Sequence, residues 1–214
     1  MCKSIREPFN ALSHLVAAVL VFAGTIGLVA VSWKEPAAWI SFLVFGLAAV
    51  FLYVSSCIYH WTPKALLGLQ KLDHTAIYVM IAGCYTPLCL LVLNGAAGWW
   101  VLGLQWSLAL LGVVLTLTMT KPPHWVRIVL YLVMGWMALP FASVVIAQAG
   151  WGPLSWLIGG GLFYTIGVFF YASRKPMLWP GVFSGHEVWH LFVMAGTACH
   201  FMLMIGLLGQ GSPA

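Results

Sequence analysis

Charged residues are scarce in this sequence of 214 residues: they account for 6% of it, and only four of them are acidic. A soluble domain carries roughly a quarter charged residues. Hydrophobic residues make up 63% of the chain. This balance excludes a soluble globular domain and predicts an all-α membrane protein, with room for one compact bundle of helices and no separate soluble domain.

Cysteine pairs are also missing. The five cysteines are scattered, mostly in apolar stretches, and no CxxC pair occurs. This excludes a disulfide framework and a thiolate metal site. A signal-peptide cleavage site is absent as well, because the first apolar run follows a basic flank and continues to Trp33 without a clear small-residue site. We expect this run to be a retained first span.

Apolar runs separated by charged or turn-forming segments predict seven membrane-spanning helices. Each run has about the 20 residues needed to cross a hydrocarbon core of roughly 30 Å. The turns NGAAG and QAGWGP divide two stretches that are too long for one helix. The predicted spans, all in a single domain over 1–214, are 11–33, 38–61, 74–93, 99–119, 126–147, 153–172 and 184–208.

Lysine and arginine collect in cytoplasmic loops, so their positions predict the orientation. If the N-terminus is cytoplasmic, Lys34 is the only lysine or arginine that lies on the outer side. The residues inside are Lys3, Arg6, Lys64, Lys71, Lys121, Arg127, Arg174 and Lys175. An odd number of spans then places the C-terminus outside. The net charge of +5 has the same origin, and we attribute it to topology and attraction to anionic membrane lipids rather than to nucleic-acid binding.

Two histidines four residues apart, His186 and His190, open the last apolar run. Residues four apart share one face of a helix, so both rings can reach the same ion. His200 lies near the same face, further along the helix. Ionisable side chains inside a membrane segment are costly and indicate a functional site.

Other polar residues are predicted at the same depth. Ser56 and His60 lie one turn apart at the inner end of the second span, and Asp73 begins the third span. Near the start of the first span are Glu7, Asn10 and His14. Four helix ends therefore bring histidines, carboxylates and a serine to one layer near the inner face.

This layer predicts a zinc site. His60, His186 and His190 would supply three imidazole nitrogens at about 2.0–2.1 Å and leave a fourth position for water, as in catalytic zinc sites. Asp73 would orient or deprotonate that water, and Ser56 would hydrogen-bond a substrate carbonyl or its developing oxyanion. The alternative is that these polar residues only pack helices together. His200, some 15 Å beyond His190, is too far for the same ion and is expected to be buried and hydrogen-bonded.

The remaining polar residues are assigned no role as ligands. Glu7, Asn10 and His14 are interpreted either as hydrogen-bonded neighbours of the metal or as an N-terminal cap that meets lipid headgroups. Glu187 is expected at the membrane interface rather than as a ligand. The side chain of His74 is expected to point away from Asp73, and His124 to start a helix.

Four motifs together resemble the haemolysin III branch of the progestin and adiponectin receptor family over essentially the whole chain. They are the early EPFNALSH, SxxxH at Ser56 to His60, LDHTAIYVMIAGCYTP from Leu72, and the late HEVWHLFVMAGTACHF. The resemblance implies a seven-helix bundle with a cytoplasmic N-terminus and a zinc near the inner face. It implies His60, His186 and His190 as ligands and Asp73 as the aspartate that contacts the water. The short chain looks like a bacterial plasma-membrane member.

Three functions follow from these features. The family is related to alkaline ceramidases, which implies a zinc-dependent hydrolase of a lipid amide or ester, with membrane lipids as partners. The name haemolysin implies pore formation, although a chain that is hydrophobic throughout offers little for a switch from soluble to membrane form. The third hypothesis is a receptor or sensor in which zinc ties the second, third and seventh spans together.

Overall fold

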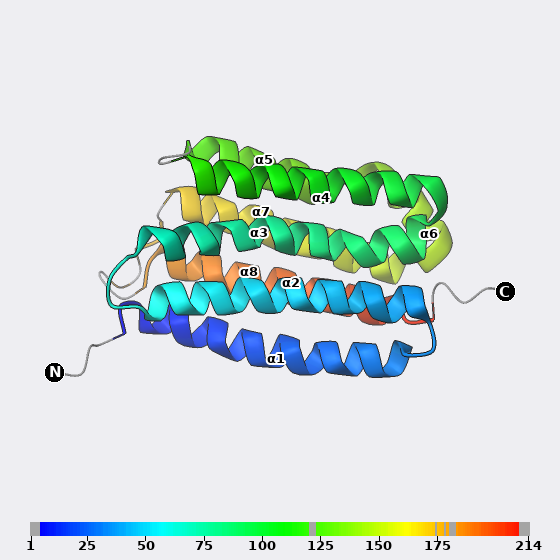
Figure 1. Ribbon diagram of the computed structural model, residues 1–214, viewed down its shortest axis with the longest axis horizontal. Helices are drawn as coiled ribbons and strands as arrows, with labels where there is room; N and C mark the ends of the chain where they lie inside the picture. Colours follow the sequence, from blue (N-terminus) through cyan, green and yellow to red (C-terminus); the bar gives the residue numbers. More distant parts are fainter. Residues whose placement is uncertain (1–4, 120–122, 174, 178, 180–182, 210–214) are drawn as a thin grey trace.

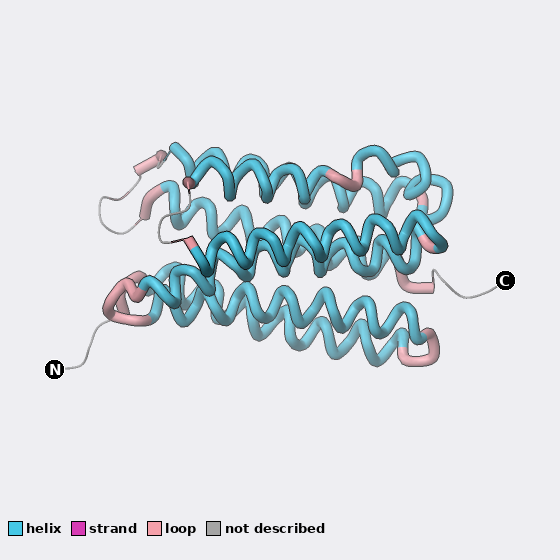
Figure 2. Tube along the Cα trace, turned by 45° about the horizontal axis from the view of Figure 1, so that its top comes forward, coloured by secondary structure: helices cyan, strands magenta, loops and turns pink. Residues whose placement is uncertain are grey.

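The computed structural model describes residues 5–119, 123–173, 175–177, 179 and 183–209. Cys2, Lys3, Lys121, Arg174 and the segment 210–214 lie outside the described residues. Seven helical segments are long and apolar enough to cross a membrane, which confirms the predicted number. The described residues form no β-strand beyond an isolated bridge between Trp179 and Phe183 (Figure 2). The helices are α1 (Pro8–Ser32), α2 (Pro36–Trp61), α3 (Leu67–Pro87), η1 (Leu88–Leu93), α4 (Gly95–Thr118), α5 (His124–Trp136), η2 (Leu139–Phe141), α6 (Ala142–Ala149), α7 (Trp151–Ser173) and α8 (Gly185–Gly206).

The helices run parallel or antiparallel along one axis (Figure 1). Neighbours in the chain pack together, α3 also contacts α5, and α5 packs on α7. Contacts between α1 and α8 close the arrangement into a ring. The starts of α1, α3, α5 and α8 and the end of α2 therefore lie at one end of the bundle, at the left in Figure 1. We call this the site end.

Two spans depart from the predicted helices. The third begins at Leu67, seven residues before the predicted start at His74, so Asp73 lies in the second turn. It continues beyond Pro87 as a π-helix. The fifth is divided between α5, a short 3-10 turn that contains Pro140, and α6. Proline cannot donate a backbone hydrogen bond and clashes with the preceding turn, which explains why the helix is interrupted there.

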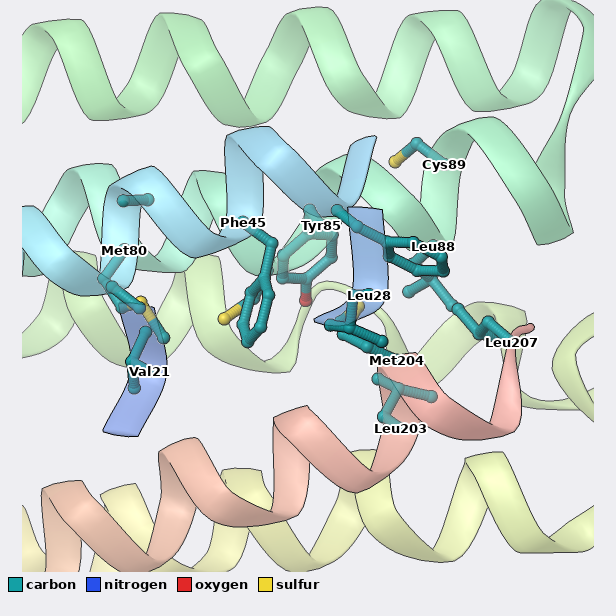
Figure 3. Close-up of a cluster of buried hydrophobic side chains, with 14 of the residues drawn as sticks. Val21, Leu28, Phe45, Met80, Tyr85, Leu88, Cys89, Leu203, Met204 and Leu207 are labelled. Atoms are coloured by element: carbon teal, nitrogen blue, oxygen red, sulfur yellow. The ribbon is translucent and has the colours of Figure 1, made fainter. Parts of the chain in front are cut away.

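Apolar side chains from α1, α2, α3 and α8 pack together in the bundle (Figure 3). Phe45, Leu203 and Met204 are fully buried in this cluster. Inside a bilayer the lipid tails are as apolar as leucine, so helices associate through close packing rather than through exclusion of water. This packing fixes the four helices whose site-end turns carry the histidines and carboxylates.

Candidate metal centre

Three histidines from two helices meet at the site end. The ligand atoms of His60, His186 and His190 all lie within 4.8 Å of one another. His60 is in the last turn of α2, and the other two are in the first two turns of α8. His60 and His190 are buried, and His186 is half-buried. The prediction that these three side chains converge is confirmed, and the group could hold a metal ion.

The geometry of the three rings fits such an ion. The Nε2 atoms of His186 and His190 are 3.1 Å apart, close to the roughly 3.3 Å between two nitrogens bound tetrahedrally at about 2.05 Å. The Nε2 atom of His60 is buried and has no hydrogen-bond partner. A buried polar atom without a partner is costly unless a ligand completes it. Three imidazoles are a donor set that suits zinc.

Glu7 determines which nitrogen of His60 is available. The Glu7 Oε2 atom lies 2.6 Å from His60 Nδ1, and the Glu7 backbone N–H donates to the His60 carbonyl at 3.2 Å. Burial raises the pKa of the Glu7 carboxyl, but the hydrogen bond and charge of His60, the hydrogen bond from Asn10 and the charge of Arg6 outweigh it and lower the pKa to about 2. When His60 is neutral, the carboxylate accepts the Nδ1 proton and Nε2 keeps its lone pair, as with carboxylates behind metal-bound histidines.

A capping box begins α8 and places its histidines. The Ser184 hydroxyl accepts from the His186 N–H at 3.2 Å, while Glu187 Oε2 accepts from the Ser184 N–H at 2.6 Å. Asn10 Nδ2 donates to both Glu187 Oε1 and Glu7 Oε2 at 3.0 Å. Among the described residues, Glu187 is buried and lies outside the group of converging ligands, and its place at the membrane interface stays a prediction. Glu7, Asn10 and Glu187 form a continuous network that joins α1 to α8 and to His60.

Asp73 lies beside the histidines. In the part of the chain that the structure describes, the group of converging ligands consists of the three histidines without Asp73. The Asp73 carboxylate interacts with Ser56 and with His60. Ser56 is buried on α2, one turn before His60.

A cavity of about 120 Å³ extends from this centre into the bundle. Ser56, Asp73, His186 and His190 line one end of it, and His200 lines it further along α8. Along the helix axis, His186 and His200 are about 21 Å apart. The walls between these ends are mainly apolar side chains of α3, α5, α7 and α8, among them Ile77, Ile81, Leu132, Leu157, Val168 and Val193.

The other histidines have separate surroundings. The His14 ring lies 4.0 Å from the His190 ring, centroid to centroid, and is buried. His200 Nδ1 is 2.9 Å from the Gly196 carbonyl, and its ring stacks on Tyr164. The expectation of a buried, hydrogen-bonded His200 is confirmed. His124 begins α5 as predicted. His74 lines the same cavity as Asp73 but contacts Arg127 on α5, whereas Asp73 interacts with Ser56 on α2.

Sequence reasoning missed Arg127, which it counted only among the basic residues on the inner side. The structure places Arg127 in the first turn of α5, buried and in the cavity lining. Tyr131, one turn further along the same helix, also lines the cavity and donates its hydroxyl to the His74 carbonyl at 2.8 Å. The four-residue spacing of Arg127 and Tyr131 was the signal that a polar face of this helix turns inward.

The fold and the site define a multi-pass integral membrane protein with a buried three-histidine group that could hold a metal ion. Residues 2–201 match the family described as Haemolysin-III related. The chain is 34% identical to the Hemolysin-3 homolog of Bacillus subtilis, over 94% of this chain and 93% of that protein. It is 31% identical to Hemolysin-3 of Bacillus cereus, over 96% and 93% of the two chains. It is also 27% identical to the human Monocyte to macrophage differentiation factor, over 79% of this chain and 69% of that protein. The chain therefore belongs to the haemolysin III family, with more distant similarity to adiponectin-receptor-like proteins.

Proposed function

We propose that the protein is a zinc-dependent hydrolase that cleaves an amide or ester bond of a lipid in the bacterial inner membrane. The observation that carries this proposal is the position of the three imidazoles at one end of an apolar cavity inside the bundle. A structural site would need no such cavity. A hydrolase of lipids needs both a polar reaction centre and an apolar space for the chain of its substrate.

His60, His186 and His190 would hold the zinc. Zinc bound by three protein ligands lowers the pKa of water to about 7 and polarises a carbonyl. Glu7 keeps His60 in the tautomer that presents Nε2, and the capping box fixes the first turns of α8. The protein thus supplies a site whose ligands are oriented before substrate enters.

Asp73 and Ser56 would move and orient the protons. As the oxygen of water forms its bond to the carbonyl carbon, Asp73 accepts a proton from that water. Asp73 returns this proton to the leaving nitrogen or oxygen when the C–N or C–O bond breaks. Ser56, which interacts with Asp73, either holds the carboxylate in place or donates to the oxyanion that develops on the carbonyl oxygen. The apolar cavity walls hold the acyl chain and keep further water away.

Replacing Asp73 by asparagine tests the proposal, since the amide is nearly isosteric but cannot accept a proton. We expect Asp73→Asn to retain zinc and thermal stability and to lose hydrolysis of ceramide-like and ester lipids. Ser56→Ala should lower turnover less, by the loss of one hydrogen bond, at most on the order of 3 kcal/mol. Zinc content, unfolding temperature and fatty-acid release are measured for all three proteins.

One result would overturn the proposal that the protein is a hydrolase. If the wild type, fully loaded with zinc, releases no fatty acid from any such lipid while Asp73→Asn merely loses stability, the zinc ties helices together. The better account is then a receptor with a structural zinc.

A further inference from the structure

A second polar cluster lies beside the histidine centre, around Arg127. Its guanidinium contacts Nδ1 of His74 through Nη1, and Nη2 is 2.9 Å from Nδ1 of His124. Arg127 is only 7% exposed, and both Arg127 and His74 line the cavity that also contains Asp73. A buried cation inside a membrane protein is costly and requires a compensating partner.

The chain offers Arg127 no carboxylate in contact. All four acidic residues belong to the described part of the structure. Glu7 and Glu187 are bonded to other groups at the site end, and Glu35 precedes α2 at the opposite end of the bundle. Asp73 interacts with the Arg127 charge and lines the same cavity, but the two side chains form no ion pair among the described residues. The positive charge is therefore available to a molecule in the cavity.

The hydrogen-bonding groups of the cluster favour an anion. Arginine has five N–H donors and no acceptor, and the contacts with His74 and His124 use two of the donors. Because each Nδ1 accepts from the guanidinium, the ring proton of His74 is on Nε2, which leaves that ring a donor as well. Beyond these contacts, three guanidinium donors and one imidazole donor remain on two residues that line the cavity, and an occupant that binds them must supply acceptors. A phosphate supplies more acceptor oxygens than a carboxylate, and arginine binds it through two parallel hydrogen bonds.

We infer that Arg127 and His74 form an anion subsite that binds the phosphate of a lipid, while the amide or ester carbonyl of the same lipid lies at the histidine centre. The substrate is then a phosphate-bearing membrane lipid rather than a neutral one. This assignment of the substrate class rests on the proposed hydrolase. The subsite itself depends only on the contacts and the charge of Arg127.

Thermal unfolding of the purified, zinc-loaded protein tests the subsite with three probes that share a 16-carbon chain: hexadecyl phosphate, palmitate and hexadecanol. We expect hexadecyl phosphate to raise the unfolding temperature saturably and hexadecanol to do so much less. Arg127→Gln should weaken the apparent affinity for hexadecyl phosphate about tenfold or more, because charge-assisted hydrogen bonds are lost. Lys71→Gln is the matched control: it removes a positive charge at the same end of the bundle, but Lys71 bonds to the Leu117 carbonyl and does not line the cavity.

Arg127 also joins α5 to α3, so Arg127→Lys is measured alongside Arg127→Gln. Lysine keeps the charge but loses the planar fork, and its affinity for hexadecyl phosphate should fall several-fold. Unchanged affinity in both variants overturns the inference, as does equal stabilisation by hexadecanol. Stabilisation by palmitate without stabilisation by hexadecyl phosphate overturns the phosphate assignment.

The same titration after removal of zinc by a chelator separates the subsite from the metal and from hydrolysis. Hexadecyl phosphate has no carbonyl to cleave, so its binding is independent of catalysis. Binding that persists without metal and still depends on Arg127 supports the subsite even if no lipid is hydrolysed. Binding that disappears with the metal overturns the inference. If neutral lipids are cleaved and hexadecyl phosphate does not bind, the result supports the proposed hydrolase and overturns the phosphate subsite.

Discussion

A histidine offers two nitrogens, and the hydrogen bond at one of them determines what the other can do. At His60 the 2.6 Å contact between Nδ1 and Glu7 leaves Nε2 buried without a partner, directed to the place where His186 and His190 also present Nε2. The candidate metal centre would therefore depend on residues that do not contact the metal. Glu7 is the clearest of these.

The three proposed ligands are tested by single alanine substitutions. His60→Ala, His186→Ala or His190→Ala leaves two imidazoles, so each variant should lose most of its bound zinc. His200→Ala should keep it, because its ring is bonded to the Gly196 carbonyl and lies about 15 Å further along α8 than His190. Elemental analysis of the purified proteins measures this. Full zinc in His60→Ala together with loss in His200→Ala would show that the assignment is wrong.

Glu7→Gln tests the orientation of His60. The amide oxygen still accepts a hydrogen bond but carries no charge, and loss of such a partner weakens metal binding about 10- to 100-fold. Competition with a zinc chelator measures the affinity. Glu35→Gln, the same change between α1 and α2 at the opposite end of the bundle, is the control and should leave the affinity unchanged. Equal affinities for Glu7→Gln and wild type would assign Glu7 a purely structural role.

At the level of whole helices, small residues allow close approach. A Cβ atom added at Gly83 on α3 would lie 2.5 Å from the Cβ of Ala48 on α2. Inside a membrane such close contacts replace the hydrophobic effect as the source of helix association. The contact between α2 and α3 matters for the site because these helices carry His60 and Asp73.

Replacing two helical glycines by alanine distinguishes the effect of close helix packing on stability from the effect of helix propensity. Gly83→Ala should destabilise the protein by about 1–3 kcal/mol, because the backbones of α2 and α3 must move apart. Gly103→Ala on α4 meets no atom within 4 Å and should be neutral or stabilising by up to about 1 kcal/mol. Unfolding of both variants in the same detergent measures the difference. Equal stability of the two variants would argue against close packing at Gly83.

The sequence predicts the helices and the convergence of the three histidines better than it predicts their surroundings. Apolar length alone indicates seven spans, and the spacing of His186 and His190 follows from the helical period. The interruptions near Pro87 and Pro140 depend on how neighbouring helices accommodate a proline, so composition does not reveal them. Asn10 and Glu187 are 177 residues apart in the chain, and no local pattern predicts such a pair. The role of Arg127 was missed for the same reason, since its partner His74 is 53 residues away in the chain.

For the whole molecule, the distribution of basic residues predicts a cytoplasmic N-terminus and an external C-terminus. Seven spans place the start of α1 and the end of α8 at opposite ends of the bundle. Reporter fusions after Thr62, Gly95 and Ala214 test the orientation. We expect cytoplasmic activity at Thr62 and external activity at the other two positions. A reporter at Ala214 that is active only in the cytoplasm would overturn this topology and place the histidines near the other face.

The contact between α1 and α8 joins the first and the last helix to be synthesised. The proposed ligands come from residue 60 and from residues 186 and 190, and Glu7 orients the first of them from the opposite end of the chain. A ribosome has therefore translated nearly all of the protein before the last two imidazoles exist, and six spans are already complete by then. Binding of a metal ion by this group would therefore be a late event in biogenesis, after synthesis of the final helix. A chain that stops before Gly185 would contain six complete spans and no competent centre.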